Sequence, residues 1–121
     1  MIINIGIDII EISRIDDSVQ RFGKSFLDRI YTPEEQNERA DRSYFAGRWA
    51  AKEAIAKALG CGIGKDCSWL DITILNDASG APTAKLGGVA ARRFAALNGT
   101  RIHVSISHER TNAIAMAIIE G

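Results

Sequence analysis

Three residues of this sequence, Asp8, Glu53 and Lys57, could together bind a metal ion and a phosphate group. Asp8 interrupts an isoleucine-rich stretch, residues 2–12, and a carboxylate buried without a partner costs several kcal/mol. Glu53 and Lys57 are four residues apart in an alanine-rich stretch, which places them on one face of a helix. Two carboxylates suit Mg²⁺ when waters and phosphate oxygens complete its coordination, and a lysine suits the phosphate itself.

Each of these residues also has a simpler interpretation. Asp8 could pair with an arginine or cap a nearby turn. Glu53 and Lys57 could form an ordinary helical ion pair, worth about 0.3–0.5 kcal/mol. The stretch after the helix, Gly60–Gly64, would let a ligand phosphate approach the backbone closely. It lacks the order of glycines and lysine that defines a P-loop, so it is a weak signal by itself.

The strand and helices that carry these residues follow from apolar periodicity. Residues 2–12 predict a strand with apolar residues on both faces, hence buried on both sides, on which Gly6, Asp8 and Ile10 share one face. Residues 43–60 predict a long central helix that ends at Gly60. Before the central helix, the sequence predicts a helix capped by Ser13, a short helical segment at 24–31 and a polar, solvated helix capped by Thr32 with Glu35. After it, the sequence predicts strands at 69–75 and 83–86, a helix at 88–99 and a hairpin of strands at 101–108 and 112–120.

This order, a strand, two or three helices, a hairpin, a helix and a second hairpin, predicts an α+β fold with helices packed on a largely antiparallel sheet. The chain has 121 residues, 46% of them hydrophobic, and a formal net charge of zero. A neutral chain lacks the positive field of a general nucleic-acid-binding protein, and no apolar run approaches the roughly 20 residues that span a bilayer. We expect a cytoplasmic protein that binds neither nucleic acid nor membrane, with Cys61 and Cys67 as free thiols.

Ser107 and His108 end the first strand of the last hairpin. A serine nucleophile activated by its neighbour is disfavoured, because consecutive side chains on a strand point to opposite faces. Contact of the hydroxyl and the imidazole with a ligand phosphate is the better interpretation.

Three segments, in this order, together resemble a known family: "GIDIIEISRI", "FAGRWAAKEAIAKALGCGIG" and "HVSISHE". They resemble the holo-acyl-carrier-protein synthases, the small bacterial type of 4′-phosphopantetheinyl transferase, over nearly the whole chain. The resemblance implies a single domain over residues 1–121. It also implies transfer of 4′-phosphopantetheine from coenzyme A to a serine of apo acyl carrier protein in fatty acid biosynthesis, with adenosine 3′,5′-bisphosphate as the other product. Members of this size are homotrimers whose active sites are shared between adjacent subunits.

The resemblance also assigns roles to individual residues. Asp8 and Glu53 match the metal-binding carboxylates, for Mg²⁺ or Mn²⁺, and Lys57 matches the lysine beside the pyrophosphate. The residues implied along the coenzyme are Lys57, Gly60, Gly62, Ile63, Gly64, Ser107 and His108. Arg14 matches a basic residue that contacts the acidic carrier protein, and the following segment would add Arg21, Lys24, Phe26 and Arg29. Cys61, where threonine is common, and Ala81, where a basic residue is common, depart from the family pattern.

The implied reaction needs no internal nucleophile, because the attacking serine belongs to the carrier protein. Glu53 is the expected base for the serine proton, directly or through a metal-bound water. Two rival hypotheses remain open at this point. A non-catalytic trimeric module would bind no coenzyme A, and a metal-dependent phosphohydrolase would release adenosine 3′,5′-bisphosphate without any carrier protein.

Overall fold

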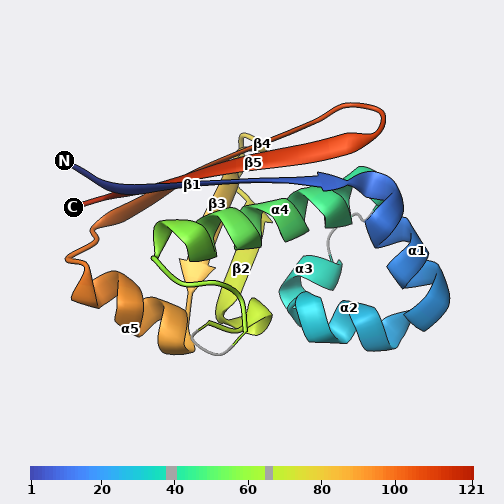
Figure 1. The fold of residues 1–121 in the computed structure, drawn as a ribbon, viewed down its shortest axis with the longest axis horizontal. Coiled ribbons are helices and arrows are strands. Elements are labelled where there is room, and N and C mark those ends of the chain that lie inside the picture. The colour runs from blue at the N-terminus through green and yellow to red at the C-terminus, as the bar shows by residue number, and fades with distance from the viewer. Residues whose placement is uncertain (38–40, 65–66) are drawn as a thin grey trace.

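One antiparallel sheet and the helix packed against it organise the molecule. The computed structural model describes residues 1–37, 41–64 and 67–121. The sheet contains, in spatial order, β1 (Ile2–Glu11), β5 (Asn112–Glu120) and β4 (Arg101–His108). Helix α4 (Arg42–Ala58) runs along one face of this sheet and packs mainly against β1 and β5 (Figure 1). Helices on antiparallel strands confirm the predicted α+β class.

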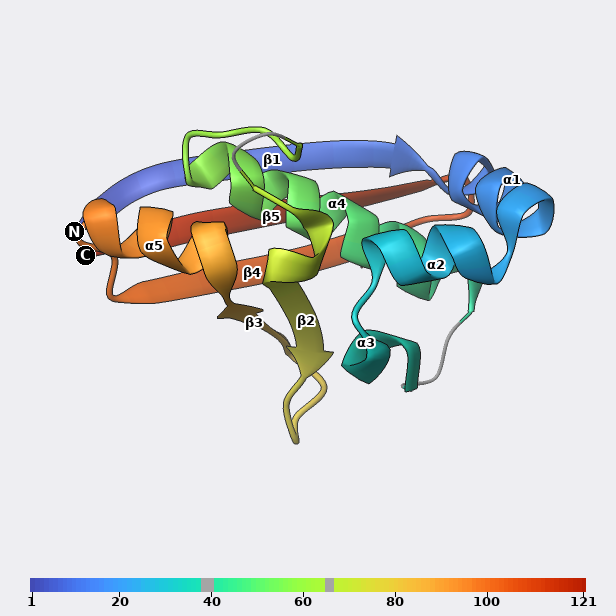
Figure 2. The same cartoon turned by 90° about the horizontal axis from the view of Figure 1, so that it is seen from below.

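The other elements lie mostly on the side of α4 that faces away from the sheet (Figure 1). Near the first residues of α4 are α1 (Ile12–Phe22), α2 (Lys24–Ile30) and the single turn α3 (Pro33–Asn37). Along the chain, α4 is followed by the 3₁₀ turn η1 (Trp69–Asp71), the hairpin of β2 (Ile72–Asn76) and β3 (Pro82–Leu86), and α5 (Gly88–Ala96). The β2–β3 hairpin projects away from the main sheet (Figure 2). Within the described ranges, no helix has the length and apolar character needed to cross a bilayer.

Small residues allow α4 to lie close to the sheet. Ala46, Ala50, Ala54 and Ala58 are fully buried along the helix. On β1, Gly6 is opposite α4, and a side chain there would overlap the backbone oxygen of Ala54. The close approach therefore depends on alanine in the helix and glycine in the strand, and it brings the polar residues of both elements near one another.

The predicted burial of β1 on both sides is wrong for the isolated chain. Gly6 and Ile10 face α4 and are buried, but Ile5, Ile7 and Ile9 on the other face are 50–62% exposed. In the part of the chain described, α4 covers one face of the sheet and nothing covers this stretch of the other. The isoleucines correctly predicted a strand, but they could not show what covers its outer face.

Several boundaries differ from the prediction. Helix α1 begins at Ile12, and Ser13 does not cap it; the amide of Ile12 donates to the carbonyl of Thr111 instead, at 2.9 Å. Four helices, α1 to α4, separate β1 from β2 in the described ranges, where the sequence predicted two or three. The strand predicted from Trp69 begins only at Ile72, because Ser68 caps the turn η1.

The capping box at the start of α3 is confirmed, and the predicted solvation holds for Pro33, Glu34 and Asn37 but is wrong for Glu35. The Thr32 amide donates to Glu35 Oε1 at 2.8 Å, and the Glu35 amide donates to Thr32 Oγ1 at 3.3 Å. Glu35 is nevertheless fully buried and forms an ion pair with the equally buried Lys52 at 2.7 Å. The amide of Ile74 on β2 donates to its other carboxylate oxygen at 2.9 Å. This pair therefore joins α3, α4 and β2.

Candidate active site

Asp8 points toward α4 from the middle of β1, as the alternation of its strand predicts. Its side chain is 17% exposed. Lys57 Nζ donates to Asp8 Oδ1 at 3.2 Å and to the carbonyl of Ile7 at 3.0 Å. In the described residues, the ion-pair partner of Lys57 is thus Asp8, and not Glu53 as in the simpler interpretation of the helix. The strand and the helix do bring the predicted residues together.

Glu53 lies one helical turn before Lys57 and is half-buried. Burial raises the pKa of its carboxyl above the ordinary 4.5, the negative charge of Asp8 raises it further, and Lys57 opposes both. Two carboxylates that repel each other beside a single lysine have a deficit of positive charge. This electrostatic environment is the one that a bound divalent cation would relieve.

The donor set also fits Mg²⁺ or Mn²⁺. Asp8 and Glu53 offer hard oxygen ligands, and Mg²⁺ is commonly held by one or two carboxylates with waters and substrate phosphates in its other positions. Among the described residues, no group of three or more histidines, cysteines and acidic residues is placed so that it could hold a metal ion. The pair therefore lacks the ligands of an enclosed structural metal site but has those of a site completed by substrate.

The glycine loop follows directly after α4, as predicted. Gly60 has φ +79° and ends the helix, and Gly64 has φ +138°. Among the described residues, and apart from the immediate chain neighbours, no atom lies within 4 Å of the position that a side chain would occupy on Gly62 or Gly64, which leaves room for a ligand beside this backbone. Ile63 packs against the core and anchors the loop.

Ser107 and His108 are not brought to Asp8 within one chain. Asp8 is opposite Ala115 on β5, which is opposite Ile106 on β4, so these residues are two strands away. Ser107 lies with Ile7 and Ile9 on the outer face of the sheet, whereas Asp8 faces α4. His108 lines a cavity on this outer face with Ser107 and also a cavity that Ser107 does not line, and among the described residues no hydrogen bond joins the two side chains.

A second group of polar residues was missed by the sequence reasoning. His108 lines a cavity of about 410 Å³ together with Tyr44, Arg48 and Asn76. Arg48 is buried, its guanidinium lies 4.2 Å from the centre of the Tyr44 ring, and it donates to Asn76 Oδ1 at 2.9 Å. An arginine and a histidine around one cavity suit a phosphorylated ligand. An arginine inside an alanine-rich buried helix was the signal that could have revealed it.

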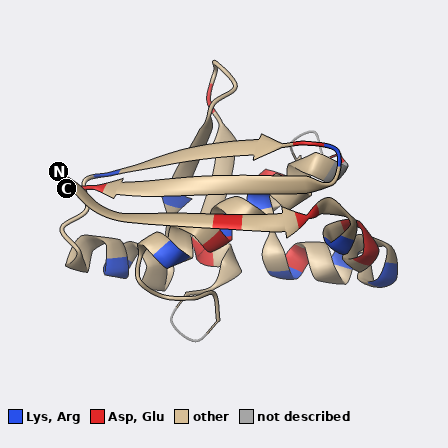
Figure 3. Cartoon of the chain, turned by 45° about the horizontal axis from the view of Figure 1, so that its top comes forward, with Lys and Arg blue, Asp and Glu red and all other residues tan. Residues whose placement is uncertain are grey.

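The residues predicted to contact the carrier protein divide into two groups. Arg14, Arg21, Lys24 and Arg29 are exposed on α1 and α2, where acidic residues also occur (Figure 3). The prediction was wrong for Phe26. Its side chain is 5% exposed and its ring stacks on Trp49 at a centroid distance of 6.2 Å, so Phe26 belongs to the core. The helical period of α2 directs it inward while its charged neighbours point outward.

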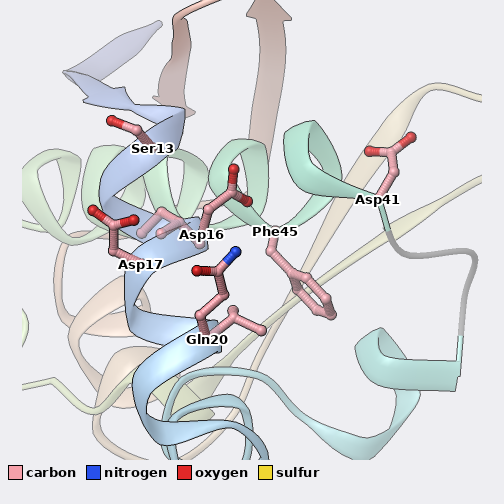
Figure 4. Close-up of a pocket in the computed structure, with 8 residues that line it drawn as sticks. Ser13, Asp16, Asp17, Gln20, Asp41 and Phe45 are labelled. Atoms are coloured by element: carbon pink, nitrogen blue, oxygen red, sulfur yellow. The ribbon is translucent and has the colours of Figure 1, made fainter.

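A larger cavity, about 590 Å³, lies elsewhere, between α1 and the start of α4 (Figure 4). Asp16, Asp17 and Asp41 line it beside Phe45. Three carboxylates disfavour a phosphate ligand, so this cavity is not the site that the sequence predicted.

Comparisons with known proteins agree with this geometry. Residues 4–118 match the family model of the 4′-phosphopantetheinyl transferase superfamily. A holo-[acyl-carrier-protein] synthase of Koribacter versatilis is 44% identical over 99% of both chains. The crystal structure of the holo-[acyl-carrier-protein] synthase from Neisseria meningitidis covers all of both chains with a TM-score of 0.90 and 36% identity.

The enzyme of the same name from Helicobacter pylori, solved in complex with coenzyme A, has a TM-score of 0.84 and 38% identity over 96% of this chain and 99% of that one. The match of the family model, the near-complete overlap with these relatives and the shared fold lead to one assignment. The chain belongs to the 4′-phosphopantetheinyl transferase superfamily and, within it, to the holo-[acyl-carrier-protein] synthases.

Proposed function

We propose that this chain transfers 4′-phosphopantetheine from coenzyme A to a serine of apo acyl carrier protein and releases adenosine 3′,5′-bisphosphate. The observation that carries the proposal is the convergence of Asp8, Glu53 and Lys57 from β1 and α4 beside an open glycine loop. Relatives at 44% identity bear the name of this activity, and a relative of the same fold was solved with coenzyme A.

In the reaction the serine oxygen attacks the β-phosphorus of coenzyme A, and the bond from that phosphorus to the bridging oxygen of the pyrophosphate breaks. Glu53 accepts the serine proton, a role that its raised pKa favours because a carboxylate with a higher pKa is a stronger base. Lys57 places a positive charge beside the pyrophosphate, whose leaving oxygen gains negative charge. Asp8 and Glu53 would hold Mg²⁺, or Mn²⁺, which when bound supplies further neutralisation of this charge.

We further propose that the working form is a homotrimer in which neighbouring subunits complete each site. Ser107 and the Asp8–Lys57 pair face opposite sides of one sheet, so a single chain cannot present them to one ligand. The outer face also exposes a group of large apolar side chains that a second copy would cover: Ile5, Ile7, Ile9, Ile114 and Met116. The cavity lined by Arg48 and His108 would receive a phosphate group of coenzyme A.

The carrier protein is acidic, and Arg14, Arg21, Lys24 and Arg29 offer it exposed positive charge on α1 and α2. Arg14 directly precedes the buried Ile15, in a helix that follows β1 directly, so a carrier docked there is close to the strand that carries Asp8. We infer that this reaction serves fatty acid biosynthesis in the cytoplasm.

The decisive experiment measures the intact mass of an apo acyl carrier protein after incubation with this protein, Mg²⁺ and coenzyme A. The mass should increase by one phosphopantetheine group, and a chelator should prevent the increase until Mg²⁺ is restored. Asp8→Ala and Glu53→Ala should abolish the increase while retaining a cooperative melting transition. Release of adenosine 3′,5′-bisphosphate without a carrier protein would indicate a phosphohydrolase, and full activity in chelator would contradict the metal site.

A further inference from the structure

Arg93 of α5 binds the end of α4, although no sequence motif pointed to it. Its Nε donates to the carbonyl of Leu59 at 2.9 Å, and its Nη2 donates to the carbonyl of Gly60 at 3.0 Å. These two carbonyls are consecutive and mark the passage from the helix to the loop Gly60–Gly64. A guanidinium presents its N–H donors in a fixed planar arrangement, which suits two neighbouring carbonyls.

The helix end needs these bonds because its own hydrogen bonds leave the two carbonyls free. The amide of Gly60 donates to the Lys57 carbonyl at 3.0 Å, and the amide of Cys61 donates to the Ala56 carbonyl at 3.0 Å. This is a Schellman arrangement with a left-handed residue, Gly60, after the helix. It satisfies the earlier carbonyls, and the guanidinium takes the following ones.

The partial negative charge of these carbonyls would repel the anionic ligand of the proposed site. The C-terminus of a helix carries a partial negative charge, which repels anions. In the function proposed above, the pyrophosphate lies beside Lys57, in the last turn of α4, and the coenzyme follows the loop after it. Lys57 is already paired with Asp8. A second cation at the helix end would therefore favour binding of an anionic ligand.

Arg93 also acts electrostatically on Cys67, whose carbonyl is hydrogen-bonded to the far end of the same loop. Burial raises the pKa of the Cys67 thiol to about 12, and the positive charge of Arg93 opposes that rise. The amide of Gly64 donates to the Cys67 carbonyl at 2.7 Å, which ties this end of the glycine segment to Cys67. Two hydrogen bonds from one guanidinium thus hold the beginning of the loop, and a backbone hydrogen bond ties its end to Cys67.

We propose that Arg93 is a positioning residue of the coenzyme site, which neutralises the C-terminal carbonyls of α4 and holds the Gly60–Gly64 loop in the shape that accepts the coenzyme phosphates. This inference rests on the proposed function. The ligand that it concerns is the pyrophosphate-bearing coenzyme and not the carrier protein. The effect is therefore expected in coenzyme binding more than in turnover.

The test compares Arg93→Gln with Arg92→Gln, which removes the same charge from the neighbouring exposed position on α5. Coenzyme A binding is measured by calorimetry with Mg²⁺ present, and the KM for coenzyme A and kcat are measured with saturating carrier protein. Arg93→Gln should raise the Kd and KM for coenzyme A about tenfold and change kcat less than threefold. Arg92→Gln should change each value by less than about twofold. Arg93→Lys, which keeps the charge but not the two-pronged geometry, should raise the Kd about threefold.

Each outcome decides between the alternatives. Equal effects of Arg93→Gln and Arg92→Gln would overturn the inference, because net charge alone would then explain them. A lower melting temperature with an unchanged coenzyme Kd would also overturn it, since the role would be structural. If Arg93→Gln did not fold, the test would rest on Arg93→Lys. A folded Arg93→Lys protein with the wild-type Kd for coenzyme A would overturn the inference. Absence of coenzyme binding by the wild-type chain would contradict the proposed function itself.

Discussion

Helix α4 carries two lysines that pair with carboxylates in opposite environments. Lys52 and its partner Glu35 are both fully buried at 2.7 Å, and the ammonium also donates to the carbonyls of Ile30 at 2.7 Å and Trp69 at 3.0 Å. The side chain of Lys57 is 51% exposed, and it meets Asp8 at 3.2 Å. The two lysines are five residues apart on one helix, so their surroundings, and not their local sequence, set the difference.

The comparison separates a structural ion pair from an exchangeable one. All three protons of the Lys52 ammonium have acceptors, and burial, which lowers its pKa, is opposed by the charge of Glu35. That arrangement leaves no position for a ligand. Lys57 is accessible to solvent and can exchange its bond to Asp8 for a phosphate oxygen without loss of the fold. The same residue type therefore supports the core at one position and is available for the proposed chemistry at the other.

The largest effect is expected for Lys52→Met. It leaves the Glu35 carboxylate buried and without its counter-charge, which should lower the free energy of unfolding by about 3–5 kcal/mol. Lys57→Met, one and a half turns away, should lower it by less than about 1 kcal/mol, because an exposed pair contributes little. Urea denaturation followed by circular dichroism measures both values.

The double variant Glu35→Leu/Lys52→Met sharpens this result. Removing both charges together leaves no unpaired buried ion, so the double variant should regain much of the stability that Lys52→Met loses. Similar losses for Lys52→Met and Lys57→Met would show that the two pairs do not differ as their burial indicates.

The order of effects should reverse when transfer is measured. Lys57→Met should lower kcat/KM for transfer about a hundredfold, because it removes a placed charge from the leaving pyrophosphate. Its melting temperature should stay close to that of the wild type. Transfer is followed by the intact mass of the carrier protein over time. A reduction below threefold would remove Lys57 from the catalytic site.

The sequence indicated the residues of the proposed catalytic site more readily than those of the core. Asp8, Glu53 and Lys57 were found because each is an ionisable residue within an apolar or alanine-rich segment, where it needs a reason to be present. The alternation of β1 and the four-residue spacing on α4 then predicted which faces they occupy. The structure brings them together as these local periods require.

Glu35 was misjudged for a physical reason. Its segment, "TPEEQNERA", is polar throughout, and local composition cannot show that one of its carboxylates turns inward to meet Lys52. That contact joins residues 17 positions apart, and the amide of Ile74 that completes it is 39 positions away. The exposure of Ile9 was missed for a related reason, since a strand does not indicate whether another subunit covers its outer face.

A smaller effect is expected from Glu53→Gln on the stability of the metal-free protein. The pKa of Glu53 is raised by burial and by Asp8, so the folded state binds its proton more tightly than the unfolded state does. Stability therefore falls as the pH rises through the interval between the ordinary value of 4.5 and the raised one. Above that interval Glu53→Gln should melt roughly 1–3 °C higher than the wild type, a modest gain because the site is half-exposed.

Scanning calorimetry in chelator at several pH values measures this difference. It should disappear below pH 4.5, where the wild-type glutamate is protonated as well. A Glu53→Gln protein that melts lower than the wild type at neutral pH would mean that Lys57 outweighs burial and Asp8. Glu53 would then sit in a balanced pair, with no need for an added cation.

The smallest effect concerns an exposed charge outside the site. Arg14→Ala should raise the KM for carrier protein about threefold and leave the KM for coenzyme A unchanged, because a rim charge affects the encounter with an acidic partner. Lys24→Ala offers a matched comparison. Lys24 is also exposed, but it already bonds to Asp28 at 2.9 Å and to Gln36 at 3.1 Å, so its loss should matter less. Added salt should reduce the difference between Arg14→Ala and the wild type, since exposed charges are screened. An equal rise in both KM values would place Arg14 at the coenzyme and not at the carrier.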